Sequence, residues 1–95
     1  MRRPDDVEIM RQALGDTLFE QGSVKVVRYE VEYTMSPVDD DDAVGVTAYL
    51  EPPQGRTWDV GDVSALSIWV RRLGYQVGID RYVSFVIARH IESAA

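Results

Sequence analysis

The sequence contains no cysteine and a single histidine, His90. The absence of cysteine excludes disulfide bonds, thiol nucleophiles, iron–sulfur clusters and thiolate zinc sites. A histidine-based triad needs an activated serine or threonine and an orienting carboxylate beside the imidazole. Ser84 lies six residues from His90 on the same face of a predicted strand, and six residues span about 20 Å at about 3.3 Å each. The sequence therefore predicts no catalytic residue, no cofactor and no metal ligand set.

Long apolar segments are also missing. The longest largely apolar window, residues 83–88, is far shorter than the roughly 20 residues that a membrane-spanning helix needs. Arg2 and Arg3 stand near the first residue, but no apolar run follows them as it would in a secretory signal. These absences predict a protein of the cytoplasm that has no membrane partner.

Positive charge is scarce, because sixteen acidic side chains outnumber ten basic ones and give a net charge of −6. Such a surface repels phosphate backbones unless a basic face is segregated. Acidic residues are interspersed with the four arginines of the C-terminal third, Arg71, Arg72, Arg81 and Arg89. The sequence also lacks the G-x-G-x-x-G, phosphate-loop and G-x-S-x-G motifs. We therefore expect no nucleic-acid partner.

What is present is typical of a globular protein. Of the 95 residues, 45% are hydrophobic and 27% are charged, which suits one domain over residues 1–95 with a flexible arm at residues 1–4. Asp5 is a good N-cap, Glu8 completes a capping-box pattern, and Gly22 is a suitable stop, so we predict a helix over 5–21. Period-2 alternation then predicts a strand over 23–34. Its Val26–Val27 step breaks phase, which indicates either a bulge or a strand start covered on both faces.

Alternation resumes after a polar loop and predicts a second strand over 43–51, paired with the first as a hairpin. Asp59 then caps a predicted helix over 60–73 that ends at Gly74, with arginines in its last turn. Residues 79–91 predict a third, long strand. The resulting fold class is α+β: a two-layer sandwich of order α-β-β-α-β, with two helices on one face of a three-stranded, mostly antiparallel sheet.

This order of elements occurs in several unrelated folds, including type II KH-like domains, ring-building modules of secretion systems and cytoplasmic domains of cation-efflux transporters. A KH domain carries a basic GXXG loop, whereas the nearest segment here, Gly61-Asp62, is acidic. A transporter domain needs histidine ligands, and this chain has one histidine. Topology alone therefore assigns no family.

Four consecutive aspartates, Asp39, Asp40, Asp41 and Asp42, are the most conspicuous polar segment. Calcium loops alternate their oxygen ligands around a glycine turn, whereas four adjacent residues point in diverging directions. We interpret the segment as a solvated hairpin loop and not as a metal site.

Several residues fall outside the predicted core and form the candidate interface. Aromatic and arginine side chains are enriched at protein–protein interfaces, and a long edge strand at residues 79–91 invites pairing with another chain. The predicted interface residues lie on the outer side of the second helix or on the sheet face away from the helices: Tyr49, Ile68, Tyr75, Tyr82, Val86, Arg28 and Arg81.

These features support three hypotheses. The first is a non-catalytic, adaptor-like interaction module that forms a homodimer or larger assembly, or docks on a partner protein, through the open sheet face or the edge strand. The second is an acidic inhibitor or immunity-type protein whose aspartate loop blocks a basic surface of its target. The third is an enzyme or small-ligand domain with a pocket between the second helix and the sheet, near Trp58 and Trp69.

Overall fold

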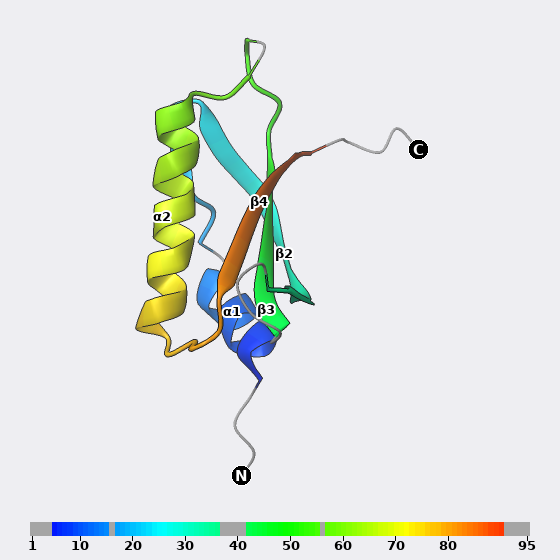
Figure 1. Cartoon of the computed structure of the whole chain (residues 1–95). Coiled ribbons are helices and arrows are strands. Elements are labelled where there is room, and N and C mark those ends of the chain that lie inside the picture. Colours follow the sequence, from blue (N-terminus) through cyan, green and yellow to red (C-terminus); the bar gives the residue numbers. More distant parts are fainter. Residues whose placement is uncertain (1–4, 16, 37–41, 56, 91–95) are drawn as a thin grey trace.

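Two helices pack on one face of a four-stranded mixed β-sheet (Figure 1). The structure, a computed structural model, describes residues 5–15, 17–36, 42–55 and 57–90. In chain order its elements are α1 (Asp6–Leu14), β1 (Glu20–Gln21), β2 (Val24–Met35), β3 (Asp42–Leu50), α2 (Val60–Gln76) and β4 (Val83–Arg89).

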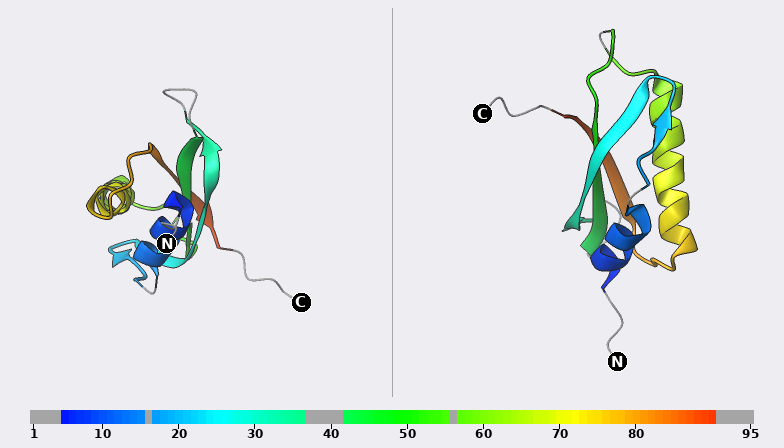
Figure 2. Two further views of the ribbon diagram at one scale, coloured as in Figure 1. Left: turned by 90° about the horizontal axis from the view of Figure 1, so that it is seen from below. Right: turned by 180° about the vertical axis from the view of Figure 1, so that it is seen from behind.

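The sheet has the strand order β1-β2-β3-β4. The β1–β2 and β2–β3 pairs are antiparallel, and the β3–β4 pair, which α2 connects, is parallel. Figure 2 shows both helices on the same side of the sheet, as predicted. The α+β class is therefore confirmed, whereas the three-stranded sheet and the α-β-β-α-β order are wrong because β1 adds a strand after α1.

The first helix is much shorter than the predicted span of residues 5–21. It ends at Leu14 because Gly15 adopts a positive φ of 39° and donates its N–H to the Arg11 carbonyl at 2.8 Å. Gly22, the predicted helix stop, instead occupies the two-residue β1–β2 turn with a φ of 55°. A left-handed glycine suits a helix end and a tight hairpin equally well, so the residue type alone did not separate the two.

Both helices begin at the aspartates that were predicted as N-caps. The Asp5 carboxylate accepts the Glu8 N–H at 2.8 Å, and the Asp59 carboxylate accepts the Asp62 N–H at 3.2 Å. These bonds satisfy amide groups that have no partner inside the helix.

The end of α2 differs from the prediction. The helix continues three residues beyond the predicted end, and Gly74 is a buried position inside it. A Cβ at Gly74 would lie 3.1 Å from a Val83 methyl group, so glycine permits close helix–strand contact there. Gly78, with a φ of 82°, follows the actual C-cap. Arg71 and Arg72 consequently lie before the last turn, which contains no basic residue.

The phase break in β2 is a bulge. Residue pairing with β3 shifts between Val26 and Arg28, so Val26 and Tyr29 both face the helices although they are three residues apart. The bounds of β2 and β3 agree with the predicted strands to within one residue at each end. The strand predicted over 79–91 is too long, since the observed β4 runs only from Val83 to Arg89. Residue 91 of that prediction lies outside the described residues.

The core lies between the helices and the inner face of the sheet. Its nine largest fully buried side chains come from α1, β2, β3 and α2: Met10, Leu14, Val24, Val26, Val44, Val46, Leu50, Leu66 and Val70. Beside them, the Trp69 ring lies 5.5 Å from the Phe19 ring and 6.4 Å from the Tyr29 ring, centroid to centroid. Burial raises the pKa of Tyr29 above 10.0, and its hydroxyl donates to the Thr17 carbonyl at 3.3 Å.

The β1–β2 turn docks on the start of α2. The Asp62 carboxylate accepts the Ser23 N–H at 2.8 Å and the Ser23 hydroxyl at 2.9 Å, and that hydroxyl accepts the Asp59 N–H at 2.8 Å. Both bonds from Ser23 lower the pKa of Asp62 below 3.8, and the bond from the backbone N–H has the larger effect. These contacts fix the hairpin against α2 across 39 residues of sequence.

Candidate interaction surface

The outer edge of β4 has no neighbouring strand in the part of the chain that the structure describes. Two backbone hydrogen bonds at the ends of β4 show which of its residues direct their N–H and C=O groups at β3. Val44 N–H donates to the Tyr82 carbonyl at 2.9 Å, and His90 N–H donates to the Leu50 carbonyl at 2.8 Å. In a parallel pair, alternate residues direct both backbone groups at the same neighbour. The residues whose N–H and C=O groups point away from the sheet are therefore Val83, Phe85, Ile87 and Arg89.

These outward groups have no hydrogen-bond partner among the described residues. Figure 1 looks onto this edge, and no other described element passes in front of β4. Val86, on the outer face beside Thr47, is 54% exposed, and Phe85 and Ile87 on the helix face are half-buried. Within the described part of the chain, the edge thus combines unpaired backbone groups with apolar side chains on both faces.

The opposite edge, on β2, is protected in three ways. β1 pairs with its first residues, a bulge interrupts it at Val27, and an Arg11 Nη2 donates to the Val31 carbonyl at 2.9 Å. Pairing, bulges and charged side chains are the usual devices that prevent strand addition at an edge. In β4, by contrast, the last of seven residues, Arg89, is the only charged one.

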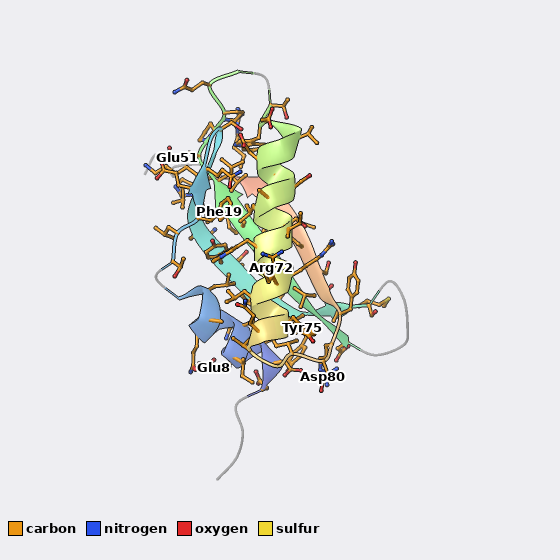
Figure 3. The ribbon with its side chains drawn as sticks, turned by 90° about the vertical axis from the view of Figure 1, so that its left-hand side faces the viewer. Glu8, Phe19, Glu51, Arg72, Tyr75 and Asp80 are labelled. Atoms are coloured by element: carbon orange, nitrogen blue, oxygen red, sulfur yellow. The ribbon has the colours of Figure 1, made fainter. Side chains whose placement is uncertain are left out.

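A shallow hollow of about 310 Å³ adjoins the start of the β4 edge. Ile79 and Val83 are 7% and 9% exposed and give it an apolar floor, whereas Tyr75 at its rim is 84% exposed. Figure 3 shows Tyr75 at the end of α2 and Asp80 in the connection that follows. The residues around the hollow come from that helix end, the connection and the start of β4: Arg71, Tyr75, Ile79, Arg81, Tyr82 and Val83.

The two arginines that border the hollow differ in whether a described acidic side chain pairs with them. Arg81 Nε lies 3.1 Å from the Asp6 carboxylate, its Nη1 donates to the Asp42 carbonyl at 3.2 Å, and its guanidinium lies 5.6 Å from the Tyr33 ring centroid. Arg71 is exposed and has no ion-pair partner among the described residues. Arg71 therefore carries the positive charge that is available to a ligand of the hollow.

Charge is unevenly distributed along the chain. Residues 1–62 carry fourteen acidic and six basic side chains, whereas residues 63–95 carry two acidic and four basic ones. The described members of this basic group lie on α2, in the connection after it and on β4. Residues 63–95 thus carry a net positive charge, although Asp80 lies in the connection beside the hollow and Asp6 pairs with Arg81.

The hollow brings together three of the predicted interface residues, Tyr75, Tyr82 and Arg81. Tyr82 was expected on the sheet face away from the helices, but it precedes β4 and borders the hollow at the end of α2. Sequence reasoning missed Arg71 and Ile79 as site residues. The spacing of Arg71 and Tyr75, four residues apart on one helix face, is the signal that could have indicated their proximity.

Tyr49 and Arg28 occupy a separate place on the outer sheet face. The Arg28 guanidinium lies 3.7 Å from the centroid of the Tyr49 ring, and Arg28 and Glu30 form an ion pair at 3.8 Å. The Tyr49 hydroxyl donates to the Glu30 carboxylate, and this bond raises the pKa of Tyr49 above 10.0. The three side chains thus satisfy one another, and Tyr49 is half-buried.

Ile68, another predicted interface residue, is 55% exposed on α2, two turns before Tyr75, and does not border the hollow. Both tryptophans of the hypothesised pocket make contacts within the described part of the chain. Trp58 donates its indole N–H to the Glu51 carbonyl at 3.0 Å, and Trp69 packs against Phe19. Neither tryptophan borders the hollow beside β4.

Three of the four loop aspartates, Asp39, Asp40 and Asp41, lie outside the described residues. Asp42 is the exposed first residue of β3. Within the described ranges, no three or more His, Asp or Glu side chains gather as a metal site would require, and no helix is long and apolar enough to cross a membrane. No protein-family model, curated protein or solved structure matches this chain.

Proposed function

We propose that this protein is a cytoplasmic, non-catalytic interaction module that takes up an extended segment of a partner protein along the outer edge of β4. The observation that supports this proposal is the contrast between the two edges of the sheet. The β2 edge is protected by β1, a bulge and Arg11, whereas the β4 edge presents backbone groups that no described residue pairs with, flanked by apolar side chains.

Strand addition uses both features of such an edge. Main-chain hydrogen bonds provide affinity, and pockets for alternate side chains provide specificity. The seven residues of β4 span about 23 Å at about 3.3 Å per residue. An added strand would therefore reach from Arg89 to the hollow beside Val83.

The outer sheet face is a weaker candidate for the same role. Its main aromatic residue, Tyr49, is already covered by Arg28 and hydrogen-bonded to Glu30. A partner on that face would have to displace these contacts, whereas a strand added to β4 displaces no hydrogen bond formed within the described chain.

A matched pair of variants tests the proposal. Ile87→Ala removes more apolar side chain than Ile87→Pro does, but only the proline removes an outward N–H. Because that N–H is not part of the β3–β4 ladder, proline is tolerable there, as it is at edge strands generally. Proteins captured from cell extract by the wild type should be purified and titrated against both variants. We expect Ile87→Ala to retain most of the affinity and Ile87→Pro to lose it.

Two controls keep this test decisive. Circular dichroism and thermal unfolding establish that both variants fold. Equal binding by Ile87→Ala and Ile87→Pro would overturn the proposal. So would the absence of any partner whose capture depends on the β4 edge.

An acidic inhibitor that blocks a basic target is the second candidate, and the fourteen acidic side chains of residues 1–62 favour it. Its affinity would depend on Asp39–Asp42 and would fall steeply with salt. Asparagine at these four positions would then abolish target binding, whereas Ile87→Pro would leave it intact.

A further inference from the structure

We propose that the segment taken up by β4 is acidic, and that one of its carboxylates occupies the hollow beside Arg71. This inference rests on the proposed strand addition and specifies the chemistry of the partner. An extended strand along β4 places one end beside Val83, which belongs both to the edge and to the floor of the hollow.

The walls of the hollow suit a short acidic side chain. Ile79 and Val83 supply an apolar floor for its methylene groups, and Arg71 supplies a cation without an internal partner among the described residues. Tyr75 and Tyr82 are 84% and 40% exposed, so their rings can pack on the incoming backbone. Arg81 adds positive charge, although Asp6 offsets much of it at 3.1 Å and the exposed Asp80 precedes Arg81 in the same connection.

The same charges disfavour a second copy of this chain as the occupant. Two identical β4 edges related by a two-fold axis would pair in antiparallel fashion. Arg89 of one copy would then approach the start of β4 in the other copy, where Arg71 and Arg81 lie. Like charges placed opposite each other across a strand pair are destabilising. An acidic side chain of another protein meets Arg71 with opposite charge.

A displayed library of random peptides about ten residues long, which is long enough to cover β4 and the hollow, tests the inference. We expect the peptides selected by the wild-type protein to alternate apolar and polar residues and to carry an aspartate or glutamate near one end. A selected peptide, labelled with fluorescein, should then be titrated by anisotropy against Arg71→Glu and Arg72→Glu. Arg72 is the matched control because it is exposed on the next position of α2 (Figure 3) and does not border the hollow.

The expected result is binding that is weakened about 3–10-fold by Arg71→Glu and is nearly unchanged by Arg72→Glu. Replacing the peptide's acidic residue with lysine should restore binding to Arg71→Glu. Selected peptides without an acidic preference, or equal losses in the two variants, would overturn the acidic partner. If those peptides still lose binding to Ile87→Pro, strand addition itself stands. A library that yields no peptide dependent on the β4 edge would overturn both proposals.

Discussion

At the scale of single residues, Asp62 leaves no room for a side chain at Gly22. Gly22 has a φ of 55°, and a Cβ there would lie 2.4 Å from an Asp62 carboxylate oxygen. That carboxylate holds Ser23 at the start of α2 through two bonds. A side chain at residue 22 would thus strain the turn and displace the contact that docks it.

We predict that Gly22→Ala lowers the free energy of unfolding by at least about 1–2 kcal/mol, the usual cost of a left-handed backbone for a residue with a Cβ. Gly55→Ala is the control, because no atom lies within 4 Å of a Cβ at that position, and it should change stability by less than about 0.5 kcal/mol. Urea denaturation of the three proteins measures the difference. Equal stability of Gly22→Ala and Gly55→Ala would show that the turn tolerates a side chain.

The same residues explain where prediction from sequence succeeded and where it did not. Asp5 and Asp59 were identifiable as caps because their bonds are local, reaching only three residues along the chain. The role of Asp62 was not identifiable from the sequence, because its main partner, Ser23, is 39 residues away. Glycine was the most ambiguous residue type: Gly22 turns a hairpin and Gly74 permits a close helix–strand contact, although both were predicted to end helices.

At the scale of elements, periodicity predicted β2 and β3 well because each strand is nine or more residues long and alternates more buried with more exposed side chains over much of its length. β1 has two exposed residues and therefore carries no pattern to detect. The predicted strand over 79–91 was too long because Ile79 is buried in the connection after α2, where its N–H donates to the Gly74 carbonyl at 3.0 Å. An apolar residue fixed by tertiary packing is indistinguishable from a strand residue in the sequence.

The edge position of β4 predicts an alternating pattern of amide hydrogen exchange. The N–H groups of Ser84, Val86 and Ala88 point at β3, whereas those of Phe85 and Ile87 point to solvent. We expect slow exchange for the first group and exchange for the second that is faster by at least about 100-fold, since solvent-exposed amides are protected little. Two-dimensional NMR in deuterated buffer resolves each amide. Uniform protection along β4 would mean that another segment already covers this edge.

An acidic peptide that binds this edge should slow the exchange of Phe85 and Ile87 selectively. Exchange of Ser84, Val86 and Ala88, which already face β3, should change little. The edge amides thus report occupancy directly, without any substitution in the protein. The sequence could not have indicated this alternation, because the phase of β4 depends on its pairing with β3 and not on its own residues.

At the scale of the whole molecule, the separation of charge predicts opposite salt dependences for two kinds of association. Pairing of two β4 edges brings Arg89 of each copy toward Arg71 and Arg81 of the other, so salt would screen a repulsion. Binding of an acidic segment at the same edge is an attraction, which salt would weaken. Exposed charges interact over about 30 Å at 0.01 M salt and over about 3 Å at 1 M.

We therefore expect the protein to sediment as a monomer at low ionic strength, with any dimer becoming more populated as salt increases. Over the same range of salt, the affinity for the selected acidic peptide should fall. Sedimentation velocity measures the first quantity and fluorescence anisotropy measures the second. Arg71→Glu should reduce the salt dependence of peptide binding, since it removes the cation that attracts the peptide's carboxylate. A wild-type dimer that is tightest at low salt would instead identify a second copy of this chain as the occupant of the β4 edge.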